Sequence, residues 1–346
     1  MAGKSLSGRQ GIHMAKKIKN IGIIGDGGWG TTLAIHLARK NYHVTVWGPF
    51  PEYAHEVEQG RYNTKFLPGI KLTEGISVTG DLEAAVQNSH LIVLATPSKF
   101  IHPVLSSLKK FDLSKKIVLS VIKGIDTVKL LRMSQIIQKE LGKVPLAVLS
   151  GPTIAIEVAK GMPSTAVIAS HNMKTAKTLQ SIINSDTFRI YTNSDVTGVE
   201  LGGSLKNVIA IACGVCDGLG FGTNAKSAIL SRGLAEMARL GKALGAKNET
   251  FYGLTGLGDL VTTCVNAQSR NRSVGEALGR GKSIEEITAS MSMVAEGVET
   301  VKAAHKLSRK FKIPMPITEE VYNIICRNKK PQQAVSDLMK RATKAE

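Results

Sequence analysis

The residues most suggestive of chemistry are a glycine-rich run, Gly-Asp-Gly-Gly-Trp-Gly, at positions 25–30. Residues 18–24 have the apolar, β-branched composition of a strand, and residues 31–39 have the apolar spacing of a helix. Glycines at this spacing allow a sharp turn, close approach of a pyrophosphate, and close packing of the helix on the strand. Because free N–H groups at a helix N-terminus bind phosphate oxygens, the run predicts a dinucleotide-binding site rather than a simple tight turn.

Two lysines stand where a charge is unusual. Lys123 directly follows an expected buried strand at 117–122, and Lys206 lies within an apolar helical segment at 196–214. Gly202 and Gly203 precede Lys206 by four and three positions, so they share its helix face and leave room beside it. Each glycine costs a helix about 1 kcal/mol relative to alanine, which favours a group that must approach closely. The alternatives are a surface-loop position for Lys123 and, for Lys206, a helix crossing at the glycines with the lysine in solvent.

A third candidate is the segment Ser-Arg-Asn-Arg at 269–272, which begins an expected helix. Ser269 is a plausible N-cap residue, and the free N–H groups behind it together with the Arg270 guanidinium suit a phosphate dianion. Asp259 directly follows an expected glycine-rich turn at 253–258. The plain structural alternatives are an exposed capped helix for the arginines and a simple turn residue for Asp259.

Composition limits the class of protein. A chain of 346 residues with 43% hydrophobic and 21% charged residues is typical of a globular protein of about two domains. No uninterrupted apolar run approaches the roughly 18 residues of a membrane span, so no membrane span is expected. The net charge of +18 favours an anionic partner, yet the basic residues are spread along the chain and aromatics make up only 5%. We therefore expect a cationic surface that attracts small anionic substrates and no nucleic-acid partner.

The four cysteines, at positions 213, 216, 264 and 326, do not form a disulfide framework in a chain of this length. Cys213 and Cys216 have C-x-x-C spacing, but they lie in an apolar helical stretch, and no second pair or suitably spaced histidine follows them. The pattern predicts buried thiols in a reducing cytoplasm and no metal site.

The first half of the chain alternates strand and helix patterns. The expected strands are 18–24, 44–47, 91–95, 117–122, 146–149 and 165–169, and the expected helices between them are 33–39, 82–86, 104–108 and 131–141. This alternation predicts an α/β fold, a Rossmann-like, doubly wound, mostly parallel sheet with helices on both faces. From residue 195 onward the strand signal disappears, and the expected helices are 196–214, 225–244, 270–278, 283–288, 298–308 and 316–326.

We therefore expect a dinucleotide-binding domain at 18–194 and an all-helical substrate and catalytic domain at 195–346. Residues 1–17 are expected to be a leader or a disordered N-terminus. Within them residues 1–13 are polar, lack an apolar core, and look like a leader or expression scar before a natural start at Met14.

Together the motifs resemble the bacterial type of NAD(P)-dependent glycerol-3-phosphate dehydrogenase. The resemblance runs in order from about residue 18 to 340. It is carried by Gly-Asp-Gly-Gly-Trp-Gly-Thr-Thr-Leu-Ala (25–34), Ser-Gly-Pro-Thr (150–153), Glu-Leu-Gly-Gly-Ser-Leu-Lys-Asn-Val-Ile-Ala (200–210), Gly-Leu-Gly-Asp-Leu (256–260), Asn-Ala-Gln-Ser-Arg-Asn (266–271) and Met-Pro-Ile-Thr-Glu-Glu (315–320).

The resemblance implies a role for each matching residue. Lys206 would be the proton donor and acceptor at the reacting oxygen, with Lys123 and Asp259 as its catalytic partners. Residues expected at the substrate, a phosphorylated triose or glycerol, are Lys123, Gly151, Thr153, Lys206, Asp259, Ser269, Arg270 and Asn271. Residues expected at the cofactor are Gly25, Gly27, Gly28, Trp29, Gly30, Pro49, Lys123, Ala155, Arg270, Val294 and Glu296. Burial and the charge of Lys123 are expected to lower the pKa of Lys206 more than Asp259 raises it.

Three residues depart from the family pattern. Asp26 replaces a small residue between the first two glycines, with its side chain expected to point away from the pyrophosphate, and Ile154 stands where phenylalanine is common. The second strand ends in Trp-Gly-Pro-Phe at 47–50, without the acidic residue that would hold a ribose 2′-hydroxyl or an arginine that would hold a 2′-phosphate. The cofactor is therefore NAD or NADP, with the choice open.

The resemblance also implies a cytoplasmic homodimer that supplies glycerol phosphate for phospholipid synthesis. Two other functions compete with this hypothesis. A β-hydroxyacid dehydrogenase would also use a helix lysine but has no need for the phosphate-binding segment at 269–271. A basic regulatory protein that only senses a nucleotide fits the net charge, but it leaves Lys123, Lys206 and Asp259 without a purpose.

Overall fold

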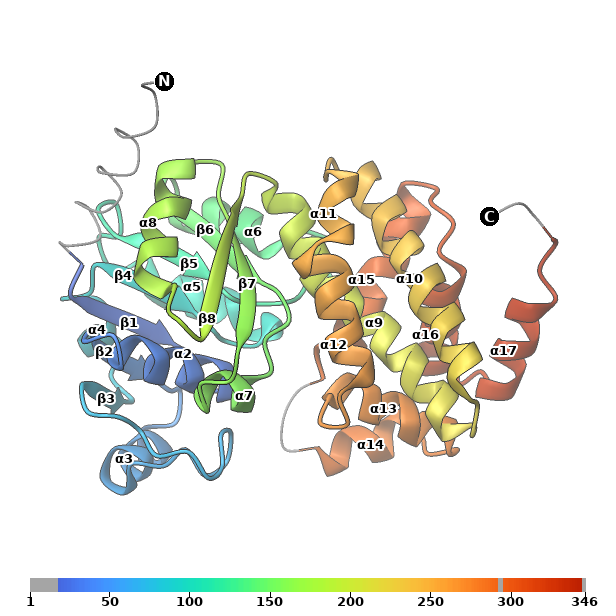
Figure 1. The fold of residues 1–346 in the computed structure, drawn as a ribbon, viewed down its shortest axis with the longest axis horizontal. Helices are drawn as coiled ribbons and strands as arrows, with labels where there is room; N and C mark the ends of the chain where they lie inside the picture. Colours follow the sequence, from blue (N-terminus) through green and yellow to red (C-terminus); the bar gives the residue numbers. More distant parts are fainter. Residues whose placement is uncertain (1–17, 292–294, 344–346) are drawn as a thin grey trace. The chain divides into compact units, whose positions relative to one another are not determined.

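The computed structural model describes residues 18–291 and 295–343, which form two compact units (Figure 1). The first unit comprises the described residues up to Ile122 together with Met133–Val196. The second comprises Lys123–Arg132 and the described residues from Thr197 onward. The short segment Lys123–Arg132, which lies within the range expected for the first domain, is thus part of the second unit. The proposed leader at 1–17 lies outside the described residues.

Across the described residues, the first unit is built on one eight-stranded sheet with the order β3-β2-β1-β4-β5-β6-β7-β8. The strands are β1 (Asn20–Ile24), β2 (His43–Trp47), β3 (Ile76–Thr79), β4 (Leu91–Leu94), β5 (Ile117–Ser120), β6 (Leu146–Ser150), β7 (Ser164–Ala169) and β8 (Phe188–Asn193). Every neighbouring pair is parallel except β6 and β7, which are antiparallel. The predicted mostly parallel, doubly wound sheet is confirmed.

Helices cover both faces of this sheet. They are α2 (Gly28–Ala38), α3 (Pro51–Gly60), α4 (Leu82–Val86), α5 (Ile101–Leu108), α6 (Met133–Leu141), α7 (Ala155–Ala159) and α8 (Met173–Ile183), with a short 3₁₀ turn, η1 (Ser98–Phe100), before α5. In Figure 1 α2, α7 and α8 lie on one face and α5 and α6 on the other. All residues of β4 and β5 are buried because both strands lie between two helical layers.

Apart from the segment Lys123–Arg132, the described residues of the second unit form helices joined by loops, with no strand. Its helices are α9 (Val196–Gly218), α10 (Thr223–Ala243), α11 (Asn248–Tyr252), α12 (Asp259–Val265), α13 (Arg270–Gly279), α14 (Ile284–Ser290), α15 (Glu296–Lys310), α16 (Pro316–Arg327) and α17 (Pro331–Met339). The all-helical prediction for this part of the chain is confirmed.

Helix α9 is the central element of the second unit. It has 23 residues and is long and apolar enough to cross a membrane, but its most apolar stretch is completely buried inside the protein. Glu200, Lys206 and Asn207 interrupt its apolar sequence and are themselves buried. α9 is therefore a core helix, and its few polar side chains face other protein groups.

Glycines let α13 lie directly against α9. A Cβ atom at Gly214 would lie 2.0 Å from the carbonyl oxygen of Arg272, and one at Gly275 would lie 2.0 Å from that of Ile211. The two backbones are therefore in contact, and a side chain at either position would force them apart. This contact fixes the first turn of α13, which carries the predicted phosphate-binding residues.

The prediction of a turn at 253–258 is wrong. Leu254–Gly258, labelled η2, forms one π-helical turn that leads directly into α12. A Cβ atom at Gly256 would lie 2.0 Å from the carbonyl oxygen of Phe251, so the glycine that suggested a loop is needed for tight packing of helical backbone. Asp259 is consequently the first residue of a helix and is held by its backbone.

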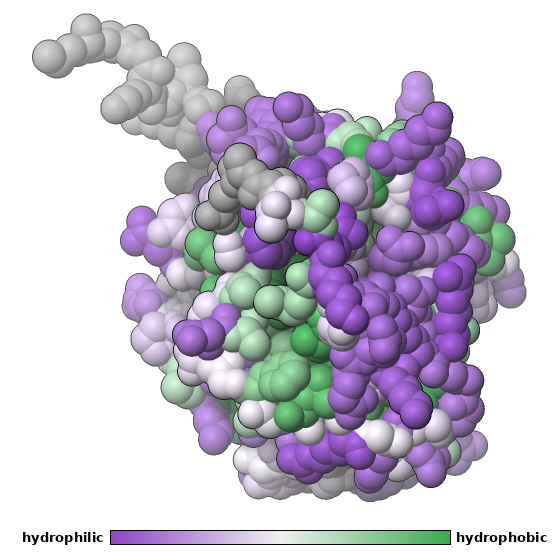
Figure 2. All heavy atoms as spheres, turned by 90° about the vertical axis from the view of Figure 1, so that its right-hand side faces the viewer, coloured by the Kyte–Doolittle hydropathy of each residue, from purple (hydrophilic) through white to green (hydrophobic). Residues whose placement is uncertain are grey.

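On the face drawn in Figure 2, hydrophilic side chains predominate and surround a region where hydrophobic side chains gather.

The described cysteines follow the sequence prediction in part. Cys213, Cys216 and Cys264 are buried free thiols, whereas Cys326 is exposed.

Candidate active site

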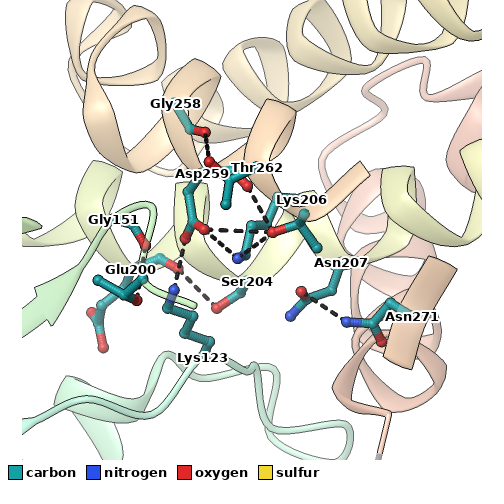
Figure 3. A network of polar contacts seen from close by, with 12 residues as sticks. Lys123, Gly151, Glu200, Ser204, Lys206, Asn207, Gly258, Asp259, Thr262 and Asn271 are labelled. Atoms are coloured by element: carbon teal, nitrogen blue, oxygen red, sulfur yellow. Dashed lines mark hydrogen bonds and ion pairs between the residues drawn. The ribbon is translucent and has the colours of Figure 1, made fainter. Parts of the chain in front are cut away.

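Asp259 joins the two predicted lysines in the interior of the second unit (Figure 3). Its Oδ1 accepts a hydrogen bond from Lys206 Nζ, and its Oδ2 accepts one of 2.8 Å from Lys123 Nζ. The Asp259 side chain is 1% exposed, that of Lys206 is 7% exposed, and that of Lys123 is 18% exposed. One carboxylate therefore neutralises one of two ammonium groups, and the cluster keeps a net positive charge that suits an anionic substrate.

Gly202 explains how Asp259 reaches Lys206. A Cβ atom at Gly202 would lie 2.5 Å from the carbonyl oxygen of Thr255, so η2 packs directly on the backbone of α9. Asp259 begins α12 immediately after η2. The glycine notch thus serves a helix crossing, as one alternative supposed, but Lys206 lies in the protein interior at that crossing and the solvent alternative is wrong.

The segment Lys123–Arg132 holds Lys123 against α9. Ile125 belongs to the same apolar core as Leu201 and Leu205, and the Arg132 guanidinium pairs with the Glu200 carboxylate. The Ser204 hydroxyl donates to the Gly124 carbonyl oxygen at 3.3 Å and to that of Glu200 at 2.8 Å. Lys123 lies in a loop and is partly buried, and its ammonium group points inward to buried Asp259 and not out into solvent.

Thr263 is a residue of this cluster that the sequence analysis missed. Lys206 Nζ donates to Thr263 Oγ1 at 2.6 Å, and this hydroxyl donates to the Asp259 carbonyl oxygen at 2.7 Å. An ammonium has three donors, and no third acceptor for Lys206 is found within residues 18–291 and 295–343. The remaining N–H can therefore bind a substrate oxygen. The signal for Thr263 is its spacing of four residues from Asp259, which places both on one helix face.

Burial dominates the electrostatics of Lys206. Desolvation lowers the pKa of its ammonium group to about 8, opposed by the charge of Asp259 and assisted by the charge of Lys123. The predicted balance of these effects is confirmed. A lysine with this pKa exchanges its proton near neutral pH, which an ordinary exposed lysine does poorly.

The first turn of α13 has the predicted cap. Ser269 is the N-cap residue, and its hydroxyl accepts a hydrogen bond of 3.3 Å from the Arg272 N–H. Arg270, the first residue of the helix, has an exposed side chain whose charge interacts with that of Glu296, the first residue of α15. Val294, predicted to contact the cofactor, lies outside the described residues.

Asn271 connects three helices. Its Nδ2 donates to Asn207 Oδ1 at 3.0 Å, and its Oδ1 accepts from the Gly297 N–H at 2.9 Å. Asn207 is the residue after Lys206, so this chain ties α13 and α15 to the part of α9 that carries the lysine. Substrate binding by Asn271 remains a prediction, while its carboxamide has a clear structural role.

The glycine-rich loop of the first unit has the geometry of a phosphate cradle. Gly25 adopts φ +125°, and a Cβ atom at Gly30 would lie 2.1 Å from the Gly25 carbonyl oxygen. Gly27, the N-cap residue of α2, has no heavy atom within 4 Å of a Cβ position among the described residues, so a ligand can approach it closely. Gly28 and Trp29 are the first two residues of α2, where backbone N–H groups are free.

Two buried polar atoms beside this loop support a ligand site. Trp29 Nε1 and Thr96 Oγ1 have no hydrogen-bond partner within the described part of the chain. Thr96 follows β4, at the carboxyl edge of the sheet where nucleotides bind in doubly wound folds. The loop and these orphan donors fit a dinucleotide.

The other predicted residues of the first unit also follow strand ends or begin helices. Pro49 follows β2, and Ala155 is the first residue of α7, with its carbonyl oxygen accepting from Thr32 Oγ1 at 3.1 Å. Gly151 and Thr153 follow β6. Gly151 has φ +144°, and a Cβ atom there would lie 2.9 Å from the Cα atom of Ala166. Their contacts with cofactor or substrate remain predictions.

Known families and proteins match nearly the whole length of this chain. Residues 20–176 match the family described as NAD-dependent glycerol-3-phosphate dehydrogenase N-terminus, and residues 195–336 match the family described as its C-terminus. The glycerol-3-phosphate dehydrogenase (NAD(P)+) of Citrifermentans bemidjiense is 46% identical over 336 residues, which are 96% of this chain and 99% of that protein. The enzyme of the same name from Geobacillus kaustophilus is 45% identical over 332 residues, 95% of this chain and 96% of that protein.

A solved structure extends the similarity to the fold. The crystal structure of glycerol-3-phosphate dehydrogenase from Coxiella burnetii superposes with a TM-score of 0.91 at 39% identity. The match covers 94% of this chain and 99% of that one.

Proposed function

Because the chain belongs to the NAD-dependent glycerol-3-phosphate dehydrogenase family, we infer that it interconverts dihydroxyacetone phosphate and sn-glycerol 3-phosphate with NAD(P)H. The observation that carries this function is the buried Lys206, held by Asp259 and Thr263 with one N–H left for a substrate oxygen. When bound, the nicotinamide cofactor supplies hydride to the central carbon of the ketone or accepts it from the alcohol.

Lys206 handles the proton of the reaction. As the ketone is reduced, negative charge develops on its oxygen, and the Lys206 ammonium neutralises this charge and donates a proton to it. In the reverse direction neutral Lys206 removes the proton from the hydroxyl group. Thr263 and Asp259 accept two of its hydrogen bonds and so orient the third N–H toward the reacting oxygen.

Lys123 and Asp259 tune and position this lysine. Asp259 pairs with both ammonium groups, so it fixes the two nitrogens with respect to each other. The Lys123 charge lowers the pKa of Lys206 and adds attraction for the substrate's phosphate. In the first unit the residues that would hold the cofactor are those of the loop at 25–30, with Trp29 Nε1 and Thr96 Oγ1 as donors.

The pH dependence follows from the lowered pKa of Lys206, about 8. Reduction needs the ammonium form, so kcat/KM for dihydroxyacetone phosphate should fall as pH rises through about 8. Oxidation needs the neutral form, so kcat/KM for glycerol 3-phosphate should rise over the same interval. In Lys123→Gln both midpoints should move to higher pH, because the neighbouring charge that lowers this pKa is gone. Profiles measured in both directions test this, and midpoints unmoved by Lys123→Gln would contradict it.

Arg270 and the first turn of α13 are proposed to bind the substrate phosphate. Arg270→Ala should raise KM for dihydroxyacetone phosphate about 10–100-fold, the equivalent of roughly 1.5–3 kcal/mol for hydrogen bonds to a charged group. Activity on unphosphorylated dihydroxyacetone should not change, so discrimination between the two ketones shrinks. Arg280→Ala, at a 66% exposed position paired with Glu276, is the matched control. Equal kinetics of Arg270→Ala and the control on both ketones would remove Arg270 from the site.

One assay tests the function against its two competitors. The protein is mixed with dihydroxyacetone phosphate and NADH or NADPH, and nicotinamide oxidation is followed. Rapid oxidation that requires the phosphorylated ketone supports the proposed function. Turnover of a β-hydroxyacid alone would favour the other dehydrogenase class, and nucleotide binding without turnover would favour a sensor.

We further propose that the enzyme is a cytoplasmic homodimer that supplies glycerol phosphate for phospholipid synthesis. The hydrophobic region of the surface in Figure 2 supports a partner subunit, because extended apolar patches are usually covered. Light scattering after size-exclusion chromatography should give twice the mass of 37.0 kDa, whereas a monomer at micromolar concentration would contradict the dimer.

A further inference from the structure

The position of Asp26 bears on the choice between NAD and NADP that the sequence leaves open. In dinucleotide-binding folds an acidic residue at the end of the second strand holds the ribose 2′-hydroxyl, about 20 residues after the glycines. Here that place is taken by Gly48, which directly follows β2. A Cβ atom at Gly48 would lie 2.4 Å from Asp26 Oδ2 and 2.7 Å from Asp26 Cγ. The Asp26 carboxyl group therefore occupies the space from which an acidic side chain at position 48 would start.

The sheet explains why the two residues meet. β1 and β2 are parallel neighbours with Ile24 opposite Trp47, and the Gly25 N–H donates to the Trp47 carbonyl oxygen at 2.9 Å. The segments that follow β1 and β2 leave the sheet at the same edge. Asp26, after β1, therefore lies beside Gly48, after β2. Glycine at position 48 leaves room for this carboxyl group, since a side chain there would displace it from its present position.

The Asp26 backbone is held firmly while one side-chain oxygen is left over. Its carbonyl oxygen accepts from Thr31 Oγ1 at 3.1 Å and from Asn63 Nδ2 at 2.7 Å. The residue is 7% exposed, and its Oδ2 has no hydrogen-bond partner among the residues described. A buried carboxylate oxygen without a donor is costly, and a ribose hydroxyl is a donor of the right kind.

We propose that Asp26 replaces the missing acidic residue of the second strand and makes this enzyme select NAD(H) over NADP(H). Its carboxylate accepts a hydrogen bond from the adenosine ribose of NAD(H) and repels the 2′-phosphate of NADP(H). This inference rests on the proposed function only in requiring that the glycine-rich loop binds a dinucleotide. The sequence-based expectation that Asp26 points away from the pyrophosphate is compatible with it, because the ribose lies on the β2 side of the loop.

Lys65 is the basic residue whose charge acts on Asp26. Its positive charge could instead attract the 2′-phosphate of NADP(H). Its ammonium lies 5.2 Å from the centre of the Phe66 ring and 5.7 Å from that of Tyr53. Its charge lowers the pKa of Asp26, but burial raises that pKa more. A 2′-phosphate would meet the attraction of an exposed lysine and the repulsion of a buried carboxylate, and the buried charge acts through the lower dielectric constant.

The test measures binding as well as turnover. Dissociation constants of the full-length protein for NADH and NADPH are measured by calorimetry without substrate, and kcat/KM is measured for both. We expect wild type to bind NADH at least about tenfold more tightly, and Asp26→Asn to reduce this ratio by about tenfold or more, since a like-charge contact between the carboxylate and the 2′-phosphate weakens binding. Asp112→Asn, in the loop that enters β5 from the opposite edge of the sheet, should leave the ratio unchanged.

A compensating pair of substitutions separates the charge from the fold of the loop. Asp26→Ala combined with Gly48→Asp removes the obstructing carboxyl group and places an acid at the end of β2, so it should restore the preference for NADH. Equal affinity of wild type for both nucleotides, or an unchanged ratio in folded Asp26→Asn, would overturn the role of Asp26. Binding of neither nucleotide would instead overturn the proposed function. Equal wild-type affinities would overturn the role of Asp26 even where the variants do not fold.

Discussion

Lys206→Ala is expected to lower kcat about 10²–10⁴-fold in both directions, the range typical of losing a general acid–base group. Lys206 donates to Asp259 and Thr263 and has one N–H left for the substrate, and alanine has no group that could donate or accept this proton. The Kd of the cofactor should stay the same, because the glycine-rich loop belongs to the other unit. Steady-state kinetics with each substrate at saturation measure the loss.

Two further variants test whether the charge of Lys206 or its ability to exchange a proton supports turnover. Lys206→Arg retains a positive charge but does not release a proton near neutral pH, so it should remain strongly impaired, above all in oxidation. Lys242→Ala removes an exposed lysine from the last turn of α10 and should behave as wild type. Near wild-type turnover in Lys206→Ala would show that another group carries the proton.

Asp259→Ala is expected to lower the free energy of unfolding by about 3–5 kcal/mol, in addition to impairing turnover. The substitution leaves the ammonium groups of Lys206 and Lys123 near each other without their shared carboxylate, one of them buried. The loss is therefore mainly the cost of an uncompensated buried charge. Urea denaturation followed by circular dichroism measures it.

A double variant separates this cost from simple loss of packing. Lys206→Met with Asp259→Leu removes the buried pair and fills its space with apolar atoms, so it should recover much of the stability while remaining inactive. Asp337→Ala is the control, since Asp337 pairs with Lys329 at 2.7 Å with a 40% exposed side chain and should leave the stability nearly unchanged. A loss for Asp259→Ala as small as that of the control would contradict the account.

The sheet could be predicted because its central strands have a simple physical signature. β4 and β5 are buried on both faces, so their sequences are continuously apolar. β3 and β8 were missed because they are edge strands. In β8 buried Phe188 and Ile190 alternate with exposed Arg189 and Tyr191, a weak pattern over six residues.

The candidate active-site cluster was predictable in its residue types more than in its geometry. A lysine on an apolar helix face beside glycines drew attention to Lys206, and the structure buries it, while its catalytic role remains a prediction. The contact with Thr263 depends on η2 packing against Gly202, and a local pattern of glycines suggested a loop there. The same limit applies to Asp26, whose placement depends on a glycine that directly follows the neighbouring strand β2.

The rate of a single turnover in Lys206→Met tests the proton-transfer role of Lys206 most directly, because methionine keeps much of the side-chain volume and lacks the amine. Enzyme in excess over NADH is mixed with saturating dihydroxyacetone phosphate, and loss of nicotinamide absorbance is followed, which isolates the chemical step from product release. If Lys206 transfers the proton, the rate should be about 10²–10⁴-fold below wild type with the cofactor still bound. A rate within a few-fold of wild type would contradict it.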